Sequence, residues 1–508
     1  MSVSIKVCIR CRPFTVDDKL GVLLLQTSEE NGEVNLLNTT YTTTRFAFTW
    51  AWWSAYGWQR RCKSDEDSAE QMKLINQDLA YEACGKKIKK DLLEGNAVVL
   101  FAYGLSGSGK TFTVFGPDAA DIPEAWFKHA TPFAMWGIYP RLAYDVFGVK
   151  DESWKISMKY FQNVVDIVRD LMSPTAEERN YKQGMRKDED GFMDILWCGA
   201  APLDSWNDLR ATFLVANARK AISPTQFNHQ STRGHCIMTL ETNMPKPDDP
   251  STRQRGRVYV CDLAGTEPAG DIVYASYKKV SYPDGTIDHI YQGPHSDQSK
   301  TKNLQNQGKK INLSLSEMAQ FFMKMAKAIL SKKLKPGSTI PGCNSYFLCK
   351  YLKDTMLQAR TYLFCAIRPE LKYANYTFST LGFAKNASVI KLNPKKVTDS
   401  LLFRCREHLC CCPATCPTLT INFAWRCAQA TTAATPAERK LMQELDKLKL
   451  MMEELQKQNE ALRAAAGGVD MSALTTKTAN GTDRQVSLQW CSAGPASRDL
   501  PLTLLPFD

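Results

Sequence analysis

The segment Gly104–Thr111, GLSGSGKT, constrains this chain more than any other feature of its sequence. It matches the pattern G-x-x-x-x-G-K-[ST], it follows the apolar run 97–103, AVVLFAY, and it precedes a segment that can form a helix. Glycines in such a loop let backbone N–H groups approach phosphate oxygens, and the positive end of the following helix and Lys110 add charge. The hydroxyl of Thr111 is placed to ligate Mg²⁺. The segment therefore predicts a nucleotide site at the end of a buried strand.

Strand-like and helix-like segments alternate along residues 1–396. The expected strands are 5–14, 97–103, 154–162, 235–242, 256–265 and 361–369, and the expected helices include 68–93 and 311–328. This alternation predicts an α/β domain with a central, mostly parallel sheet flanked by helices. The polar segment 268–308 is expected to form a long surface loop with a hairpin around Tyr282–Gly285. The aromatic stretch 45–58 is interpreted as a core strand and turn, with a base-stacking platform as the alternative.

Composition and charge narrow the class of partner only slightly. The 508-residue chain has a formal net charge of +11, which favours an acidic surface such as a filament, nucleic acid or anionic lipid without choosing among them. No apolar run reaches the roughly 18 residues of a membrane-spanning helix, so membrane insertion is not expected. Residues 1–13 contain no apolar signal core, and a cytosolic location is expected, where the 17 cysteines stay reduced.

Composition changes after residue 396. Residues 397–436 form a Cys/Thr/Ala-rich segment that is expected to be a disordered linker. A zinc site is the first alternative, because four residues have ligand-like gaps, although no second pair completes a standard pattern. An artefact of gene prediction is another alternative. The four candidate ligands are Cys405, His408, Cys412 and Cys416, within the cysteine-rich stretch 405–427.

Residues 437–466 contain a regular heptad seam, and the tail 467–508 is expected to be disordered. The seam consists of Leu441, Leu445, Leu448, Met452, Leu455, Asn459 and Leu462. One Asn at an a-type position favours a two-stranded parallel coiled coil, so the Leu441–Leu462 segment predicts a homodimer. The alternative is an amphipathic helix packed on its own domain.

Two further segments carry groups that suit phosphate chemistry. In 256–267, GRVYVCDLAGTE, a strand delivers Asp262, which can hold the Mg²⁺ shell through water, then Gly265, whose N–H can meet a γ-phosphate, and then Glu267. In 228–235, NHQSTRGH, the two hydroxyls of Ser231 and Thr232 and the guanidinium of Arg233 stand before another strand.

These segments, in this order, resemble the motifs of the kinesin motor superfamily over about residues 3–396. The matching segments are Arg10–Pro13 (RCRP), 101–111 (FAYGLSGSGKT), 228–235 (NHQSTRGH), 262–267 (DLAGTE), 311–316 (INLSLS) and 379–384 (STLGFA). Six motifs in family order are far more specific than a phosphate loop alone. The resemblance implies the kinesin-type motor fold, an ATPase activity, the cofactors ATP and Mg²⁺, and association with microtubules.

The resemblance also assigns roles to individual residues. It implies that Thr232 helps Thr111 and Asp262 hold Mg²⁺ or the γ-phosphate, and that Ser231 positions the attacking water. Arg233 and Glu267 would form an ion pair that closes the two switch loops, and Glu267 would assist proton removal. The nucleotide contacts implied are Arg10, Arg12 and Pro13 beside adenine, together with Gly104, Leu105, Ser106, Gly107, Ser108, Gly109, Lys110, Thr111, Phe112 and Gly265.

The sequence departs from the family pattern at several places. Gly234 replaces a serine of the first switch, and Pro268 stands where an arginine is usual. The basic filament-facing loop corresponds here to Gly342–Leu348, which carries no positive charge, and a lysine of the INKSL motif is Leu313. Nearby lysines can compensate or can be an ordinary solvated face, namely Lys324, Lys327, Lys332, Lys333 and Lys335.

The leading hypothesis is a microtubule-dependent ATPase motor in the cytoplasm and cytoskeleton, with residues 391–397 as a neck linker to the dimerising helix. The alternative is a kinesin-like ATP-binding switch or adaptor that has weakened or lost microtubule motility. A P-loop ATPase that acts on nucleic acid is a third hypothesis, motivated only by net charge and aromatic residues, so no nucleic-acid partner is expected.

Overall fold

The computed structural model describes residues 3–13, 26–28, 33–37, 43–54, 76–119, 122–232, 234–281, 287–335 and 338–400. The predicted cysteine-rich linker beyond residue 400, its zinc candidates, the Leu441–Leu462 heptads and the tail lie outside these ranges. Within them, no three His, Cys, Asp or Glu side chains gather in a way that could hold a metal ion. No helix in the same ranges combines the length and apolar character needed to cross a membrane.

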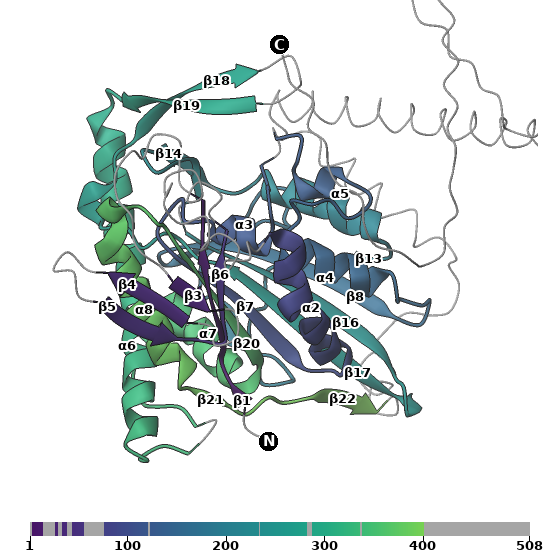
Figure 1. The fold of residues 1–508 in the computed structure, drawn as a ribbon. Helices are drawn as coiled ribbons and strands as arrows, with labels where there is room; N and C mark the ends of the chain where they lie inside the picture. The colour runs from purple at the N-terminus through teal and green to yellow at the C-terminus, as the bar shows by residue number, and fades with distance from the viewer. Residues whose placement is uncertain are drawn as a thin grey trace, which may run out of the picture. The chain divides into compact units, whose positions relative to one another are not determined.

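An 11-stranded mixed sheet runs through the described part of the chain (Figure 1). Its strand order is β10-β9-β8-β16-β17-β7-β20-β2-β6, and β13 and β22 pair with β8 and β17. The bounds are β2 Lys6–Cys11, β6 Trp50–Trp53, β7 Ala97–Gly104, β8 Lys155–Val164, β9 Ile167–Asp170, β10 Glu178–Asn180, β13 Ala201–Leu203, β16 His235–Lys246, β17 Asp249–Asp262, β20 Arg360–Ile367 and β22 Val397–Ser400. The neighbours β17, β7, β20, β2 and β6 run parallel. The other pairs are antiparallel, and among them β16 and β17 form a long hairpin.

Helices cover both faces of this sheet. They are α2 Gln77–Leu93, α3 Lys110–Val114, α4 Ile138–Phe147 and α5 Trp206–Asn217 on one face, and α6 Gln298–Leu330, α7 Phe347–Gln358 and α8 Ala374–Ser388 on the other. Alternate side chains of β7 belong to different cores: Leu100 packs toward α2 and α4, and Phe101 packs toward α6 and α7. Burial on both faces explains why residues 97–103 are uniformly apolar.

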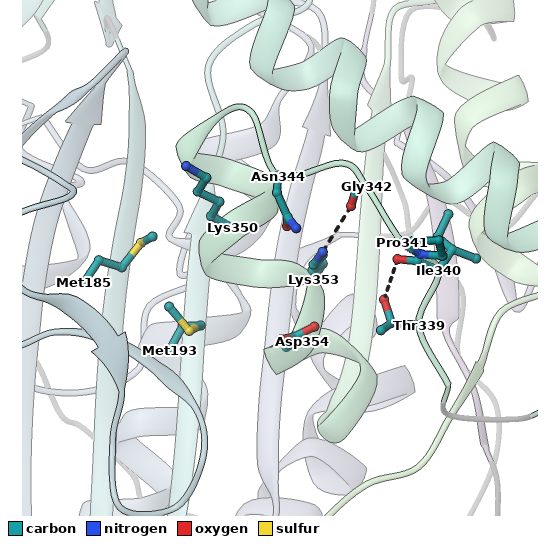
Figure 2. Close-up of a pocket in the computed structure, with 10 residues that line it drawn as sticks. All are labelled: Met185, Met193, Thr339, Ile340, Pro341, Gly342, Asn344, Lys350, Lys353 and Asp354. Atoms are coloured by element: carbon teal, nitrogen blue, oxygen red, sulfur yellow. Dashed lines mark hydrogen bonds between the residues drawn. The ribbon is translucent and has the colours of Figure 1, made fainter.

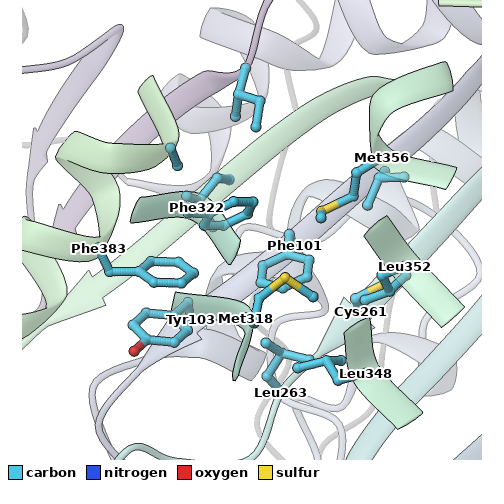
Figure 3. Close-up of a cluster of buried hydrophobic side chains, with 14 of the residues drawn as sticks. Phe101, Tyr103, Cys261, Leu263, Met318, Phe322, Leu348, Leu352, Met356 and Phe383 are labelled. Atoms are coloured by element: carbon cyan, nitrogen blue, oxygen red, sulfur yellow. The ribbon is translucent and has the colours of Figure 1, made fainter. Parts of the chain in front are cut away.

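The core beside the long helix α6 is rich in aromatic and sulfur-containing side chains (Figure 3). Phe383 stacks on Tyr103 with ring centroids 3.8 Å apart, and Phe322 lies 4.9 Å from Phe383. Tyr103 is the last residue before the phosphate loop. Helices α6 and α8 are therefore packed directly against the strand that delivers that loop.

The predicted aromatic core strand is confirmed for the described residues. Trp52 and Trp53 of β6 are buried, and Trp50 stacks on Tyr362 of β20 with centroids 6.4 Å apart. These rings cannot serve as a base-stacking platform, because the sheet already covers them. Residues 55–58 of the same stretch lie outside the described ranges.

The described residues also form five smaller sheets. They are formed by β1 Val3–Ser4 with β21 Lys391–Leu392, β3 Gln26–Ser28 with β4 Glu33–Leu37 and β5 Thr43–Ala47, β11 Met185–Lys187 with β12 Met193–Ile195, β14 Ile222–Thr225 with β15 Asn228–Thr232, and β18 Ala275–Ser281 with β19 Ile287–Pro294.

The prediction of a long loop over 268–308 is only partly right. The expected hairpin exists as β18 and β19, which flank residues 282–286 (Figure 1). The loop prediction is wrong from residue 298, where α6 begins, capped by the Asp297 side chain, which accepts hydrogen bonds from the backbone N–H groups of Ser299 and Lys300. The first turns of α6 are mostly polar and bury few apolar side chains, such as Leu304, so their sequence resembles a loop.

The segment 391–400 lies along the sheet as two short strands. β21 pairs with β1, and β22 pairs with Thr252–Arg255 of β17. Leu392 and Val397 are buried. The predicted neck-linker residues thus lie against the domain in this structure, and the pairing continues four residues beyond the predicted boundary at residue 396.

A pocket of about 440 Å³ lies between the β11–β12 hairpin, the segment 339–344 and α7 (Figure 2). Met185 and Met193 form one wall, and Ile340 and Pro341 another. No residue of the phosphate loop lines this pocket. It is therefore separate from the candidate site.

Candidate nucleotide site

Four parallel strands end at the same edge of the central sheet and bring the candidate residues together. β7 ends in the phosphate loop, β17 ends at Asp262, β2 leads into Arg12 and Pro13, and β20 leads into Arg368. The carboxyl ends of parallel strands are where α/β folds place their ligands. Segments separated by more than 350 residues thus meet at one site.

The phosphate loop has the backbone that its glycines predict. Gly104 has φ of 141°, and a Cβ at this position would collide with the carbonyl oxygen of Ala366. Lys110 is buried, and its ammonium group donates hydrogen bonds to the carbonyl oxygens of Gly104 and Leu105, both at 3.0 Å. Burial lowers the pKa of Lys110. A phosphate group would stabilise this charged ammonium, so the loop fits a nucleotide.

Ser108 also fits a bound phosphate. Its hydroxyl is buried and finds no hydrogen-bond partner among the described residues. A buried polar group without a partner costs free energy, so this hydroxyl would gain from a ligand oxygen. The loop therefore offers a second polar group besides Lys110.

Thr111 and Asp262 lie together beside the loop. The Thr111 hydroxyl donates to Oδ2 of Asp262 at 2.7 Å, and burial raises the pKa of Asp262. The other carboxylate oxygen, Oδ1, is buried without a partner within the described ranges. A hydroxyl beside a partly unsatisfied carboxylate fits Mg²⁺, with Thr111 as a ligand and Asp262 accepting from a metal-bound water.

Glu267 lies against the phosphate loop and is only 3% exposed. Its two carboxylate oxygens accept from the hydroxyl and the backbone N–H of Ser106, at 2.8 and 3.1 Å. Gly265 passes so close to this pair that a Cβ there would collide with both side chains. Asn312 of α6 donates to the carbonyl oxygen of Glu267 at 2.7 Å, so this residue joins the loop to the long helix.

The first switch is described only in part. β15 contains the backbones of Ser231 and Thr232, paired with β14. Arg233 and the side chains of residues 228–232 lie outside what the structure describes. The predicted ion pair between Arg233 and Glu267, and the roles of Ser231 and Thr232, therefore remain predictions.

The Arg10–Pro13 segment divides into a buried and a more exposed part. Arg10 is buried, and its guanidinium donates to Oε1 of Gln77 at 2.6 Å and lies 5.7 Å from the ring centroid of Phe112. Burial lowers its pKa to about 10. Arg12 donates to the carbonyl oxygen of Gly107, and Pro13 is exposed. Arg10 therefore contacts residues of α2 and α3, whereas Arg12 contacts the phosphate loop and Pro13 is exposed beside it.

Arg368 is a site residue that the sequence analysis missed. A Cβ on Gly107 would lie 3.5 Å from a terminal nitrogen of Arg368 and 3.9 Å from one of Arg12. The Arg368 guanidinium is paired with Glu370 at 2.9 Å and lies 4.1 Å from the ring centroid of Tyr373. Two guanidinium groups thus flank the loop. The signal in the sequence was weak, a single arginine after an apolar strand.

His235 connects the site to α6. The backbone N–H of Ala264 donates to Nδ1 of His235 at 3.4 Å, which leaves Nε2 as the N–H that donates to the Ser314 hydroxyl at 2.9 Å. The Ser314 hydroxyl donates in turn to the carbonyl oxygen of Ile311 at 2.7 Å. Burial lowers the pKa of His235 to about 3, which keeps the ring neutral.

The departure at Gly234 has a local reason. This residue has φ of 148°, and a Cβ would collide with the carbonyl oxygen of Asn163 in the neighbouring strand β8. A serine at this position is therefore incompatible with the backbone seen here.

Comparison with known proteins identifies the family. The model of the kinesin motor domain matches residues 26–279, half of the chain. This chain belongs to the kinesin motor superfamily. The match to the family model ends before α6, whereas the kinesin-like protein KIF1B of Rattus norvegicus is 24% identical over 409 residues, which covers 77% of this chain and 19% of that protein.

Two relatives agree with this assignment. The chain is 27% identical over 324 residues to the kinesin-1 heavy chain of Homo sapiens, covering 62% of this chain and 28% of that protein. It is 26% identical over 322 residues to the kinesin-like protein KIF22 of Danio rerio, covering 61% of this chain and 42% of that protein. The chain thus spans less than half the length of these relatives.

A solved structure of a KIF14 dimer in the two-heads-bound state, with AMP-PNP and in complex with a microtubule, has the same fold. The TM-score is 0.58 at 20% identity, and the match covers 78% of this chain and 96% of the KIF14 chain. The prediction of a kinesin-type motor fold is confirmed.

Proposed function

We propose that this chain binds and hydrolyses ATP and couples hydrolysis to microtubule binding. The observation that carries the proposal is helix α6, which contacts the nucleotide site with one face and presents a lysine-rich face to solvent. On the inner face, Asn312 donates to the carbonyl of Glu267. The exposed face carries no acidic residue, and it contains Lys302, Lys309, Lys310, Leu313, Met323, Lys324 and Lys327.

This exposed face suits an acidic filament. Its five lysines lie at helical spacing along about 40 Å of helix, estimated from the rise per residue. Glu317, the only acidic residue of α6, is buried and accepts hydrogen bonds from the N–H groups of Ser345 and Tyr346 instead. The lysine face supplies charge that the uncharged Gly342–Leu348 segment lacks, and the microtubule in the KIF14 structure is a filament to which a protein of this fold binds.

The nucleotide site supports ATP chemistry. Lys110 and the backbone of Gly104–Thr111 hold the phosphates, and Arg12 and Pro13 pack beside adenine. Thr111, Asp262 and Thr232 would hold Mg²⁺, which would supply positive charge beside the phosphates. Ser231 and the N–H of Gly265 position the water and the γ-phosphate, and Glu267, paired with Arg233, assists removal of the proton.

A second candidate function has specific support. Gly342–Leu348, the counterpart of the family's basic filament-facing loop, carries no positive charge. This observation favours an ATP-binding switch or adaptor that binds microtubules weakly.

The test is steady-state ATP hydrolysis by residues 1–400 with and without taxol-stabilised microtubules, at low ionic strength, where exposed charges act most strongly. For a motor, microtubules are expected to accelerate ATP hydrolysis about a hundredfold, which is equivalent to lowering the barrier of the rate-limiting step by about 3 kcal/mol. Basal turnover without any acceleration would favour the adaptor.

A charge-reversal pair tests the lysine face. Lys309→Glu with Lys310→Glu is expected to lower the apparent microtubule affinity at least tenfold while basal turnover stays unchanged. The matched control is Lys86→Glu with Lys87→Glu, because these exposed neighbours lie on α2, on the opposite face of the sheet. Equal effects of both pairs would show that only net charge matters.

A further inference from the structure

The segment that follows Glu267 contains the β18–β19 hairpin, for which the nucleotide chemistry above has no role. β18 starts eight residues after Glu267, and β19 ends shortly before α6 begins. The hairpin lies beyond the N-terminal end of α6 and above β14 of the first switch in the view of Figure 1. The hairpin therefore connects the second switch, residues 262–267, to α6, the helix that carries the lysine face.

Hydrogen bonds attach this segment to the first switch. The Tyr277 hydroxyl donates to the carbonyl oxygen of Thr225 at 2.6 Å. Thr225 and Tyr274 also form a bridge between β14 and the approach to β18. Gln226, in the turn between β14 and β15, accepts from the N–H of Val273 at 2.8 Å.

The same segment is attached to α6. The N–H of Tyr274 donates to the Thr301 hydroxyl at 3.2 Å. Gln305 donates to the carbonyl oxygens of Gly270 and Ile272, at 3.2 and 3.1 Å. Residues 270–277 are thus bonded to the first switch on one side and to α6 on the other.

We propose that Tyr277 and Gln226 form a strap that positions the first switch for hydrolysis by tying it to the segment behind Glu267. The inference rests on the proposed function, because β15 carries Ser231 and Thr232. Both strap residues act through that strand and are positioning residues. The strap holds the turn before β15 at a fixed distance from the second switch, so that both switches approach the phosphates together.

Tyr277 has a matched control in the same hairpin. Tyr291 is its direct cross-strand neighbour, with ring centroids 5.6 Å apart, and is 45% exposed. Tyr277→Phe and Tyr291→Phe each remove one hydroxyl and leave the ring, but only the first removes the bond to Thr225. A difference between the two variants therefore reports the contacts of the Tyr277 hydroxyl, which include the bond to Thr225.

The experiment uses the full chain and three measurements: hydrogen exchange of residues 222–232 with ADP bound, affinity for fluorescent ADP, and single-turnover hydrolysis of ATP. Tyr277→Phe is expected to speed exchange about three- to tenfold and to slow hydrolysis by a similar factor, as the loss of one hydrogen bond predicts. Gln226→Ala is expected to act in the same direction. ADP affinity is expected to stay within about twofold, and Tyr291→Phe to match the wild type.

The outcomes separate the strap from the proposed function. Unchanged exchange in Tyr277→Phe, or equal effects of Tyr277→Phe and Tyr291→Phe, would overturn the strap. Faster exchange with unchanged hydrolysis would overturn its positioning role. Absence of ATP turnover in the wild type would refute the proposed function and that positioning role together, while the exchange data would still decide whether the two switches are tied.

Discussion

Lys110 and Glu267 both form hydrogen bonds with the phosphate loop, and substitutions of the two residues are expected to have different effects. Lys110→Ala removes a buried ammonium group at the loop, and it is expected to weaken ATP binding about 10- to 100-fold, as for a charged hydrogen bond. Glu267→Ala is expected to leave ATP bound and to slow hydrolysis at least about a hundredfold, because it removes the group that assists proton transfer. Fluorescent-nucleotide binding and single-turnover hydrolysis distinguish the two effects.

Glu267→Gln provides the control for Glu267→Ala, because it nearly keeps the shape of the side chain while it removes the charge and replaces one acceptor oxygen with an NH2 donor. It is expected to hydrolyse as slowly as the alanine variant. Normal turnover in either variant would contradict the catalytic role of Glu267, and unchanged binding in Lys110→Ala would contradict the role of the loop.

Residues that act within one short motif were predictable from the sequence, and residues that act through distant contacts were not. The glycines, Lys110 and Thr111 are placed by the local backbone of the loop. Arg368 reaches Gly107 from a strand that follows more than 250 residues later, so only the sheet order could reveal it. The burial of Arg10 likewise depends on Gln77, 67 residues away.

At the scale of elements, His235 joins β16, the second switch and α6, and its pKa makes the domain sensitive to acid. In the folded protein the ring stays neutral because burial lowers its pKa to about 3, whereas in the unfolded chain it takes up a proton below about pH 6.5. Acid therefore favours unfolding, and this group alone is expected to cost about 1.4 kcal/mol per pH unit between about pH 6 and pH 3.

Chemical denaturation at pH 7 and pH 5 measures this effect. His235→Gln does not titrate, so it is expected to lose less stability between the two pH values than the wild type does, although its stability at pH 7 is lower. An equal loss in both proteins would show that other groups dominate the acid response.

Elements with a clear hydrophobic pattern in the sequence were predicted well. Elements whose structure depends on tertiary contacts were not. β7 is apolar throughout because both of its faces are covered, and its run is recognisable. The first turns of α6 lie against the β18–β19 segment, so polar residues such as Thr301 and Gln305 hold them. Their helical structure depends on tertiary contacts, which explains why the sequence favoured a loop.

At the scale of the whole molecule, the first and last described segments of the chain pair with each other or with the central sheet. Val3 pairs with Leu392, and β22 extends along β17, so that the last described residues lie against the sheet. Lys395 donates to the carbonyl oxygen of Asp190 at 3.0 Å, and Lys396 pairs with Glu94 at 3.1 Å. The alternation of strands and helices predicted the domain. The change of composition after residue 396 suggested a domain boundary there, although residues 397–400 still pair with the sheet.

The heptad segment beyond this docked strand predicts the assembly. We propose that the full chain forms a parallel homodimer through Leu441–Leu462, whereas residues 1–400 are monomeric. Because three heptads are marginal on their own, the dimer is expected to dissociate at low concentration, which sedimentation velocity between about 0.1 and 10 μM would detect. Asn459→Leu is expected to strengthen association and to relax the preference for two strands, since it removes the buried polar group that fixes register. A full chain that remains monomeric throughout this range, with and without the substitution, would show that the seam does not associate and would favour a helix that packs on its own domain.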